Sequence, residues 1–444
     1  MKKVLIIASL FDASPRIPGL CTYLSEFGWQ PFVVSPPIEE NDRKRLGLTQ
    51  KFLEITTIIN APYRGDVLWP IRKLLKRAGL QQEKSFTEQL KKKVGGNFKK
   101  KLINKLLFLY QAIFGYPDTE KTWFNPALNA GKLAFKKYNF DAIISSSPYP
   151  TSHFVAKKLK ETTRIPWLAD FRDPWSQNHN YPYGPIRKFL DVRLEKKTLK
   201  TADAIDAASF GYAKKEKNLL RRPVLTITNG FDPETLKNSK TPLTKKFTIT
   251  YTGRIYAGKQ DPTKILAAIK ELIDESHIDS QKIEIRFYGE KLSWLDVEIE
   301  KYGLKNMAAQ YGRISKEESL IKQKESQMLL LLCWEDKNET GVYPLKTFEY
   351  LAAQRPIIAT GGSENEDIKK IISDVGAGVS AISVEEIKKK LVEFYQEYKK
   401  QGSISYRGDK NKIENYSYRS MAKKFAELLN QITSQQKAAL SLLG

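Results

Sequence analysis

The stretch Thr340–Gly362, TGVYPLKTFEYLAAQRPIIATGG, gives the clearest indication of the fold. It predicts a loop, a short helix over Leu345–Gln354 and a buried strand over Pro356–Thr360. Gly341 opens the loop, and Pro344 stands where the first turn of a helix tolerates proline. A helix that leads directly into an apolar strand is typical of α/β proteins.

Three side chains share one face of this predicted helix. Lys346, Glu349 and Tyr350 are spaced at i, i+3 and i+4. A charged pair beside a glycine-containing loop can reach a polar ligand at the helix N-terminus, where amide groups and the helix dipole favour phosphate. An amphipathic helix whose charges are merely solvated explains the same spacing, so this stretch alone leaves both interpretations open.

A second segment, TGRIYAGKQDP, strengthens the ligand interpretation. It follows a predicted strand over Phe247–Thr252 and supplies Gly253, Arg254 and, five residues later, Lys259. Glycine allows the backbone to approach a ligand closely, and the two cations can contact a diphosphate from one side. Together with the later lysine and glutamate they provide cations for a diphosphate and a carboxylate for the vicinal hydroxyls of a ribose.

Composition limits the classes of protein that fit. The chain has 444 residues, which predicts two or three domains, and its 41% hydrophobic content is that of a globular protein. The formal net charge of +24 implies an anionic partner: nucleic acid, an acidic membrane surface or a phosphorylated ligand. Cys21 and Cys333 are far apart, so they form neither a disulfide framework nor a CxxC metal site, which favours a reducing compartment.

No targeting or spanning segment is predicted. The apolar run VLIIASL has seven residues and ends in Phe-Asp, without the small-residue cleavage site of a signal peptide. No run reaches the roughly 18 apolar residues of a spanning helix. We therefore expect a cytoplasmic protein that is either soluble or peripheral on the inner face of the membrane.

The first 233 residues predict one α/β domain. Apolar runs at Val4–Ser9 and Pro31–Ser35 predict parallel strands around a helix. Ligands bind at the carboxyl ends of such strands, so the loop Asp12–Gly19 is a candidate cleft loop, with Arg16 and Gly19 as candidate binding residues. An ordinary strand-to-helix turn explains the same residues.

Charged residues also follow a later strand of this domain, predicted over Ile165–Ala169. They are Asp170, Arg172 and Asp173 of the segment ADFRDPW. Charged groups that are desolvated at a strand end need a reason, which indicates a cleft, although an ion pair of Arg172 that only holds the loop is the alternative. His153 opens a helix after SSSP and is a candidate too, with a capping or core histidine as the alternative.

Residues 64–105 contain thirteen basic and three acidic residues. With the apolar stripe that follows, they predict a basic amphipathic insert over about 64–114, which suits an anionic bilayer surface. A helix packed on the domain with a solvated basic face is the alternative. Nucleic acid is not expected, because no helix-turn-helix, zinc-finger spacing or RNP-type strand accompanies the charge.

A polar, basic linker over 234–246 precedes a second α/β domain over 247–415, and a helix over 416–434 is expected to pack back on the first domain. The tail from Ser434 onward is expected to be irregular. Because strands and helices alternate in both halves, the predicted fold class is α/β, with two Rossmann-like domains that face a central cleft. The predicted strands of the second domain are Phe247–Thr252, Ile283–Tyr288, Met328–Cys333 and Pro356–Thr360.

Taken together, these motifs resemble the retaining GT-B glycosyltransferases of family 4, which use nucleotide sugars. The matching pieces are the TGR…K loop, the FYG strand end, ESQMLLLLCW, the block at 340–362 and ITNGFD. The resemblance covers the C-terminal domain and, in the N-terminal domain, mainly the first strand, ADFRDPW and TNGFD.

The resemblance implies roles for individual residues. Arg254 and Lys259 would bind the donor diphosphate, and Glu349 would bind the ribose hydroxyls. The full donor-binding set is Gly253, Arg254, Lys259, Tyr288, Gly289, Gly341, Val342, Lys346 and Glu349. The expected catalytic residues are Asp173, Asp170 and Arg172, and the expected acceptor-binding residues are Arg16, Gly19 and His153.

The sequence departs from the family pattern at two positions. The family has two glutamates eight residues apart, and the position eight before Glu349 is Gly341. Its place can be taken by one of the acids at 335, 336 and 339 or by backbone groups of the 340–343 loop. Arg172-Asp173 stands where a His-Asp pair would be expected.

The implied reaction is transfer of a sugar from a UDP- or GDP-sugar, with retention and with neither a metal nor a cofactor. The expected acceptor is a lipid-linked saccharide at the inner membrane face, in capsule, O-antigen or exopolysaccharide synthesis. A soluble GT-B enzyme acting on a small molecule, an epimerase, and a non-catalytic nucleotide-sugar-binding protein remain as alternatives. The sequence does not predict an oligomeric state.

Overall fold

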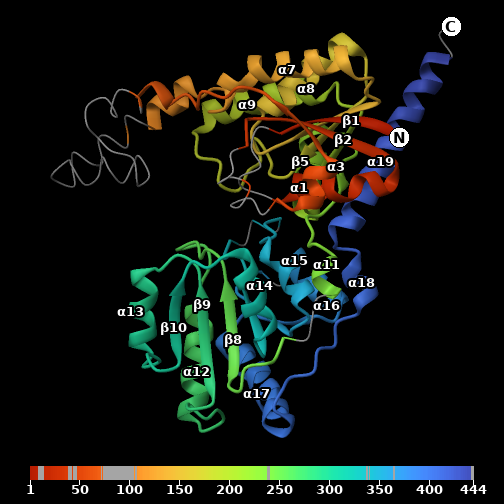
Figure 1. Cartoon of the computed structure of the whole chain (residues 1–444). Helices are drawn as coiled ribbons and strands as arrows, with labels where there is room; N and C mark the ends of the chain where they lie inside the picture. Colours follow the sequence, from red (N-terminus) through yellow and green to blue (C-terminus); the bar gives the residue numbers. More distant parts are fainter. Residues whose placement is uncertain are drawn as a thin grey trace. The chain divides into compact units, whose positions relative to one another are not determined.

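The computed structural model divides the chain into two compact units (Figure 1). Unit 1 comprises Met1–Ala208, Tyr212–Ile227 and the chain from Ala422 onward, and unit 2 comprises Ser209–Gly211 and Thr228–Met421. The residues that the structure describes are 1–8, 15–38, 43, 48–71, 73, 105, 108–237, 241–336, 339, 341–363 and 366–441.

Unit 1 contains a seven-stranded parallel sheet in the order β3-β2-β1-β4-β5-β6-β7. This is the doubly wound order of Rossmann-like domains, in which the chain starts at the centre and reverses direction once. The strands are β1 (Lys2–Ile7), β2 (Trp29–Ser35), β3 (Thr57–Asn60), β4 (Ala142–Ser146), β5 (Trp167–Phe171), β6 (Ala204–Ala207) and β7 (Leu225–Thr226).

Helices cover both faces of this sheet, with α1 on one face and α7 and α8 on the other (Figure 1). The last helix, α19 (Tyr418–Ser441), begins in unit 2 and continues in unit 1, where Asn430 accepts a hydrogen bond from Lys2 (2.8 Å). The other helices are α1 (Arg16–Leu24), α3 (Gln50–Ile55), α7 (Phe124–Lys137), α8 (Thr151–Thr163), α9 (Pro185–Leu199) and α10 (Phe210–Leu220), with 3-10 turns η1 (Ser25–Phe27) and η2 (Lys121–Trp123).

Unit 2 contains a six-stranded parallel sheet in the order β10-β9-β8-β11-β12-β13. Its strands are β8 (Phe247–Thr252), β9 (Ile283–Tyr288), β10 (Ala308–Gly312), β11 (Met328–Leu332), β12 (Ile357–Thr360) and β13 (Gly378–Ala381). Its helices are α11 (Glu234–Lys237), α12 (Thr263–Asp274), α13 (Ser293–Lys301), α14 (Lys316–Lys324), α15 (Lys346–Ala353), α16 (Asp367–Asp374), α17 (Val384–Gln401) and α18 (Lys410–Glu414).

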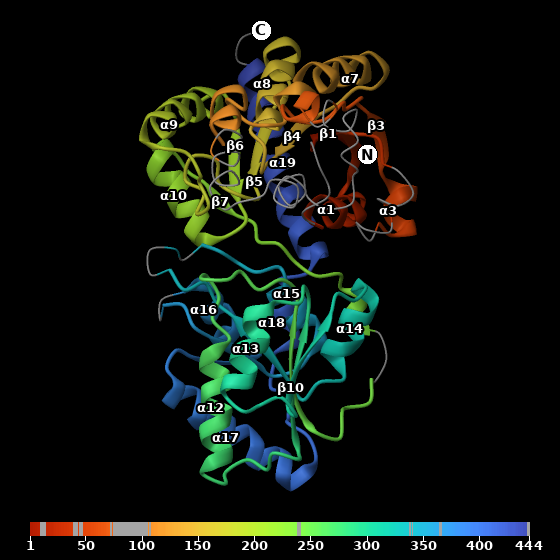
Figure 2. The same cartoon turned by 90° about the vertical axis from the view of Figure 1, so that its left-hand side faces the viewer.

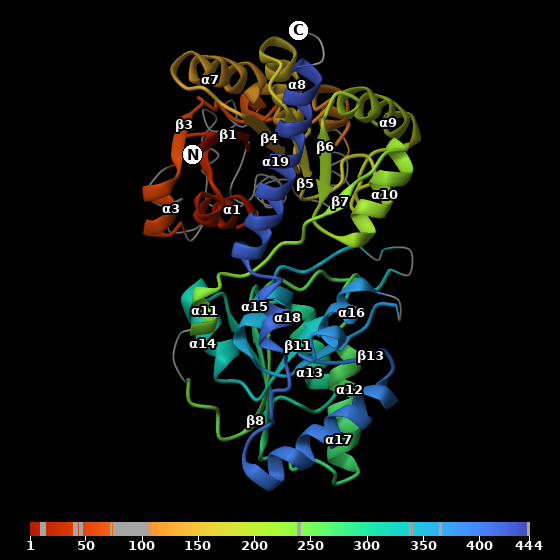
Figure 3. The same cartoon turned by 90° about the vertical axis from the view of Figure 1, so that its right-hand side faces the viewer.

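Strand β11 shows why this sheet is buried on both faces. Met328, Leu330 and Leu332 pack into the core formed with α12, α13 and α17, of which α12 and α13 stand in front in Figure 2. Leu329 and Leu331 pack into the core formed with α15 and α16, both labelled in Figure 3. A continuous apolar run is what a central parallel strand requires, because its side chains alternate between two buried faces.

The α/β class with two Rossmann-like sheets is confirmed, and strands β8 and β9 have the predicted bounds. Three short strands were not predicted: β3, β10 and β13 have only four or five residues each, too few for a clear apolar pattern. The expectation of an irregular tail from Ser434 is wrong, because α19 continues to Ser441.

The bounds of one helix and one strand of unit 1 differ from the predicted bounds. Helix α1 starts at Arg16, so Arg16 and Gly19 lie in a helix and not in a loop, and residues 9–14 of the predicted cleft loop are outside the described residues. Strand β5 ends at Phe171, so Asp170 lies within the strand. Most of the predicted insert at 64–114 is also outside the described residues. Of the helices described, none has the length and apolar composition to span a bilayer.

Candidate functional site

The carboxyl ends of β8 and β9 meet through two glycines. Thr252 and Tyr288 are register partners, and Gly253 N donates a hydrogen bond to Tyr288 O (2.7 Å). Gly253 has a φ of +107°, a region that residues with a Cβ rarely adopt. A Cβ on Gly289 would lie 2.2 Å from Gly253 O. Both turns therefore require glycine, and the two backbones lie close together.

A pocket of about 410 Å³ opens at these strand ends, and we call it the unit 2 pocket. It lies at the carboxyl ends of parallel strands, where ligands of doubly wound domains bind. Five of the nine residues predicted to bind the donor line it: Gly253, Arg254, Tyr288, Gly289 and Glu349. The other lining residues are Thr252, Glu290, Arg313, Ile314, Ser315, Lys316 and Ser319.

Three charged side chains that line the unit 2 pocket, those of Arg254, Lys316 and Glu349, make no hydrogen bond or ion pair among the described residues. The guanidinium of Arg254 lies 5.1 Å from the ring centroid of Tyr256, and it donates no hydrogen bond to any residue in the described ranges. The carboxylate of Glu349 likewise accepts no hydrogen bond from the described part of the chain. A cation and a carboxylate in one pocket are thus both available to a ligand.

The third wall of the pocket is the start of α14; a helix was predicted here from the sequence, but its residues were not predicted to belong to the site. Ser315 caps the helix: its hydroxyl accepts from Glu318 N (3.1 Å), and the Glu318 carboxylate accepts from Ser315 N (3.0 Å). Lys316 and Arg313 add positive charge, with Arg313 3.3 Å from Glu290. The SKEE sequence is a capping-box signature that marks this helix start, but strand β10 before it was not predicted.

Lys346 lies beneath the turn and is not a lining residue of the pocket. Its amino group donates hydrogen bonds to the Tyr251 hydroxyl and to Arg254 O (3.4 Å). If residue 253 carried a Cβ atom, that atom would lie 3.2 Å from the amino group of Lys346. Burial lowers the pKa of Lys346 to about 7, and the charge of Glu349 opposes this shift. Lys346 is therefore a cation whose protonation changes near neutral pH.

Tyr350 explains how helix α15 is held at this place. Its hydroxyl is buried and accepts a hydrogen bond from Thr252 N at the end of β8 (2.9 Å). Because Lys346 and Glu349 share the face of Tyr350, this bond fixes both charged residues against the Gly253 turn. The sequence predicted the shared face but not the hydrogen bond.

The structure separates Lys259 from Arg254. The amino group of Lys259 is 3.8 Å from the Asp336 carboxylate and 5.9 Å from the Trp334 ring centroid, and Lys259 does not line the unit 2 pocket. Beside it, Lys264 pairs with Glu335 (2.7 Å) in a second pocket of about 370 Å³. The two cations predicted to act together are therefore not brought together in the unit 2 pocket.

Gly341 and Val342 are also not among the residues that line the unit 2 pocket. Gly341 N donates to the Glu339 carboxylate (3.1 Å). Each of the three acids suggested as a substitute for the missing glutamate already has a partner. Glu335 pairs with Lys264, Asp336 lies near Lys259, and Glu339 accepts from the backbone.

A buried carboxyl that the sequence analysis missed lies at the end of β12. Glu366 is 1% exposed, and burial raises its pKa to about 7 against the opposing charge of Lys369. A Cβ on Gly362 would lie 2.2 Å from the Glu366 carboxyl, and a Cβ on Gly361 would lie 2.2 Å from that of Glu335. The Gly-Gly pair thus makes room for two carboxyls, which nothing in the local sequence pattern revealed.

In unit 1, two of the predicted site residues bind each other. Arg16 donates to both oxygens of Asp170 (3.0 and 3.2 Å from Nε) and to Asp206 (2.9 Å), and Ser146 donates to Asp170 (2.6 Å). Arg16, Asp170 and Asp206 all have no exposed surface. Burial and the charge of Asp170 raise the pKa of Asp206. This cluster joins α1 to β5 and β6, so the structure gives it a packing role.

Arg172 and Asp173 follow β5 and form an ion pair (3.0 Å), the alternative that the sequence left open. Their side chains keep 11% and 31% exposure, so both can be reached by a ligand. Ser147 holds this turn, since its hydroxyl donates to Asp173 O (2.7 Å) and accepts from Asp173 N (3.1 Å).

His153 and Gly19 are buried in unit 1. The imidazole Nδ1 of His153 is hydrogen bonded to the Ser145 hydroxyl (2.7 Å), which also accepts from Trp167 Nε1 (2.7 Å). Burial lowers the pKa of His153 to about 4, so the ring is neutral at pH 7. Gly19 N donates to Pro15 O inside helix α1 (2.8 Å). Acceptor binding by these residues and by Arg16 stays a prediction, and all three lie within the core.

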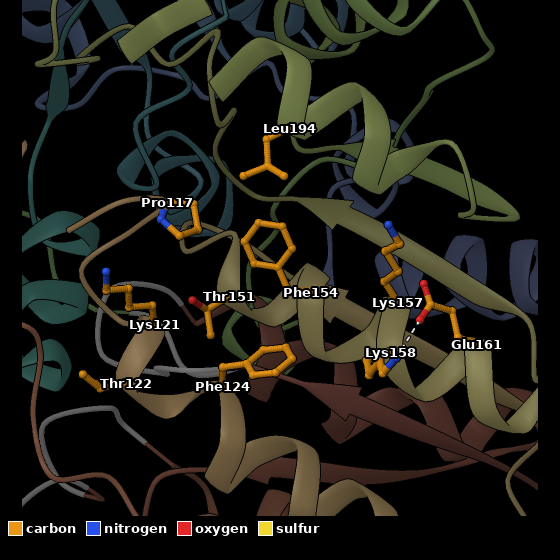
Figure 4. A pocket seen from close by; sticks show the side chains of 10 residues that line it. All are labelled: Pro117, Lys121, Thr122, Phe124, Thr151, Phe154, Lys157, Lys158, Glu161 and Leu194. Atoms are coloured by element: carbon orange, nitrogen blue, oxygen red, sulfur yellow. Dashed lines mark hydrogen bonds and ion pairs between the residues drawn. The ribbon is translucent and has the colours of Figure 1, made fainter. Parts of the chain in front are cut away.

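Unit 1 also has an open groove of about 710 Å³ along α8 (Figure 4). Its centre is apolar, with Phe154 of α8 facing Leu194 of α9 and Phe124 close by. Lys121 lies at one side and Lys157 at the other, where Lys158 pairs with Glu161 (3.2 Å).

No protein-family model matches the chain, and no curated protein matches it. Solved structures do. A glycosyltransferase from Rickettsia africae is 14% identical, with 97% of this chain and 98% of that chain covered and a TM-score of 0.58. A TarM mutant from S. aureus, solved with fondaparinux, alpha-GlcNAc-glycerol and UDP, is 10% identical over 97% and 100%, with a TM-score of 0.58.

HepE from Anabaena, solved with UDP-glucose, is 12% identical over 99% of this chain and 100% of that chain, with a TM-score of 0.53. At these identities the likeness concerns the fold alone. The fold is that of the GT-B glycosyltransferases, as the sequence predicted.

Proposed function

We propose that the chain is a glycosyltransferase that moves a sugar from a nucleoside-diphosphate sugar to an acceptor. One observation carries the proposal: the unit 2 pocket brings Arg254 and Glu349, neither of which is hydrogen bonded or ion paired within the described part of the chain, to glycine turns at the carboxyl ends of parallel strands. A ligand with an anionic diphosphate and a diol matches this pair, since the cation takes the phosphates and the carboxylate accepts from hydroxyls.

The proposed chemistry follows from charge. As the nucleoside diphosphate leaves the sugar, negative charge grows on its terminal phosphate, and groups that bind this charge more strongly in the transition state accelerate the step. Arg254 and the start of α14 with Lys316 line the pocket, and the Gly253 turn allows close approach. Lys346 beneath the turn gains a proton more readily when an anion binds, because the anion favours its charged form.

UDP is the nucleotide we favour for the donor. The structurally similar HepE and TarM were solved with UDP or UDP-glucose, whereas the sequence left UDP and GDP open. Retention and membership of family 4 rest on the resemblance of the motifs. Catalysis without a metal or cofactor is part of the proposal and is tested by chelation below.

For the acceptor we propose a lipid-linked saccharide at the inner face of the membrane, with the protein peripheral there and active in capsule, O-antigen or exopolysaccharide synthesis. Arg172 and Asp173 are our candidates for acceptor phosphate and acceptor hydroxyl, because they are the partly exposed charges after β5. For Asp170, which was predicted to be catalytic together with them, we propose a packing role instead, because it is buried and forms an ion pair with Arg16.

A second candidate is a non-catalytic nucleotide-sugar-binding protein. It is favoured by Gly341 at the position of the family's first glutamate and by the pairing of Glu335, Asp336 and Glu339. Release of free sugar from a UDP-sugar separates the two, because a binding protein would show a UDP-induced shift without turnover.

The first experiment is a thermal-shift screen with UDP, GDP, ADP and CMP, with and without EDTA. A ligand that binds only the folded state raises its stability by mass action. We expect UDP to raise Tm, with no effect of EDTA. No shift with any nucleotide would contradict a donor site in unit 2, and a shift that EDTA abolishes would contradict the metal-free site.

A further inference from the structure

Helix α9 has its polarity inverted relative to an ordinary surface helix. Its two acids, Asp191 and Glu195, are buried, while Ile186, Phe189 and Leu190 are 79%, 57% and 45% exposed. Residues 186, 189 and 190 are spaced at i, i+3 and i+4, so they form one outward face. A surface helix usually turns its apolar stripe inward. The outward apolar face therefore calls for an explanation.

Each inward acid is hydrogen bonded within unit 1 through one of its two carboxyl oxygens. Asp191 accepts hydrogen bonds from Tyr181 (2.5 Å) and Arg187 (3.0 Å), and Glu195 accepts from Ser176 N (3.2 Å). Burial raises the pKa of Glu195 to about 7. Rotating the helix to bury its apolar face would break these contacts, so the arrangement is fixed by packing and leaves the apolar face outside.

Residues 108–114 form a second segment with exposed apolar side chains, and this segment lies beside the start of α9 (Figures 1 and 2). Arg187 joins the two: it donates to Ala112 O (2.6 Å), Gly115 O (3.2 Å) and Pro117 O (2.8 Å). The exposed side chains of this segment are Phe108 (41%), Leu109 (45%), Ile113 (66%) and Phe114 (53%). With Ile186, Phe189 and Leu190 they form what we call the α9 surface.

The charge around the α9 surface is basic. On α9 itself the exposed charged residues are Lys188, Arg193, Lys196 and Lys197, because both acids face inward. Leu194 of the same helix continues the apolar surface into the groove of Figure 4, whose rim carries Lys121 and Lys157. Large apolar side chains that are exposed together mark an interaction site, and a basic border selects an anionic one.

We propose that the α9 surface docks on an anionic lipid bilayer, with its apolar side chains at the level of the headgroups and its lysines and arginines against lipid phosphates. Such a surface matches the apolar face and basic flanks of interfacial helices. The proposal rests on the proposed function in one respect: it names the surface by which the enzyme would reach a lipid-linked acceptor. The sequence prediction assigned docking to the insert at 64–114 alone; the proposed surface keeps the end of that insert, residues 108–114, and adds helix α9.

The test is sedimentation of the full chain with vesicles. We expect binding to vesicles of phosphatidylcholine with phosphatidylglycerol and much weaker binding to phosphatidylcholine alone. The double variant Phe189→Gln/Leu190→Gln should lower the partition coefficient for the anionic vesicles by about tenfold or more, since two apolar anchors are lost. Both side chains are exposed, so the variant should keep the wild-type Tm.

The matched control is Val297→Gln/Ile321→Gln on α13 and α14 of unit 2, where the two side chains are 61% and 50% exposed. It should bind vesicles like the wild type. Equal binding of the α9 variant and the wild type would overturn the proposal. So would absence of wild-type binding together with a dimer that the α9 variant abolishes, since the surface would then join two copies of the chain.

The UDP-induced shift in Tm, measured on the same proteins, separates this proposal from the proposed function. Vesicle binding that depends on the α9 surface, with no UDP shift, would leave docking intact and remove the donor assignment. A UDP shift without vesicle binding would overturn docking alone.

Discussion

The carboxyl ends of the two sheets place charged residues in opposite ways. In unit 2, Arg254 and Glu349 line a pocket and make no hydrogen bond or ion pair within the described residues. In unit 1, Arg16 and Asp170 lie at a comparable place, but they are fully buried and paired. The same topology thus uses charge for ligand binding in one unit and for packing in the other. Pairing and burial, and not position alone, separate the two.

The largest effect should come from breaking the buried cluster. Arg16→Met would leave Asp170 and Asp206 buried without their cation, and removal of one partner of a buried pair costs about 3–5 kcal/mol. Arg254→Met is the matched control and should change stability by less than about 0.5 kcal/mol. Urea unfolding checks both. Similar stability of the two variants would show that the contrast between the units is wrong.

For catalytic activity we expect the opposite emphasis, with a large effect of substitution at Arg254. Arg254→Ala should lower kcat/KM for the UDP-sugar by about 100-fold, since a hydrogen bond to a charged group contributes about 1.5–3 kcal/mol and the transition state carries more charge. Lys259→Ala should have a smaller effect, because Lys259 does not line the unit 2 pocket. The double variant Arg254→Ala/Lys259→Ala should be inactive but should keep the wild-type fold. Turnover near that of the wild type in Arg254→Ala would remove the diphosphate role.

Glu349→Ala should weaken UDP binding by about 10-fold to 100-fold, since a charged acceptor for the ribose hydroxyls is lost. Calorimetric titration measures the change. Glu317→Ala on α14 is a suitable control, because Glu317 is exposed and does not line the pocket. If Glu349→Ala binds UDP with nearly the affinity of the wild type, Glu349 does not bind the ribose hydroxyls.

The pKa of Lys346 predicts a pH dependence. With a pKa of about 7 in the free protein, Lys346 is largely neutral above that pH, whereas a bound diphosphate favours its protonated form. Binding above pH 7 therefore takes up a proton, and UDP affinity should fall by up to about tenfold per pH unit between pH 7 and 9. Lys346→Met should flatten this profile. If the wild-type affinity for UDP is independent of pH over this range, the pKa of Lys346 is not near 7 or its charge is not coupled to UDP binding.

Only a small effect on stability is expected at the partly exposed pair of unit 1. Arg172→Ala removes the ion pair with Asp173 and should cost less than about 1 kcal/mol, because such pairs are screened by water. Its effect should appear as a higher KM for the acceptor with unchanged UDP affinity. A change in UDP affinity instead would place Arg172 at the donor.

The parts of the proposed donor site that depend on local sequence pattern could be predicted from the sequence. The apolar runs of β8 and β9 placed Gly253 and Gly289 at strand ends, and the helical spacing placed Lys346 and Glu349 on one face. The turn after Arg254 was not predictable: Lys259 N bonds to Tyr256 O, and the lysine is carried away from the pocket.

Long-range pairing explains the rest of the difference. Arg16 and Asp170 are 154 residues apart, so no local pattern shows that they bind each other. On α9 the apolar spacing of Ile186, Phe189 and Leu190 was present in the sequence, but it identifies an apolar face without saying which way that face turns. Here Asp191 and Glu195 decide the orientation through contacts made elsewhere in unit 1.

The most direct test of the central claim is a calorimetric titration of UDP into the wild-type chain and into Arg254→Met, in the presence of EDTA. If the unit 2 pocket is the donor site, the wild type binds UDP and Arg254→Met binds it at least about tenfold more weakly with an unchanged Tm. If the wild type does not bind UDP, or if both proteins bind it equally, the donor site is not in the unit 2 pocket.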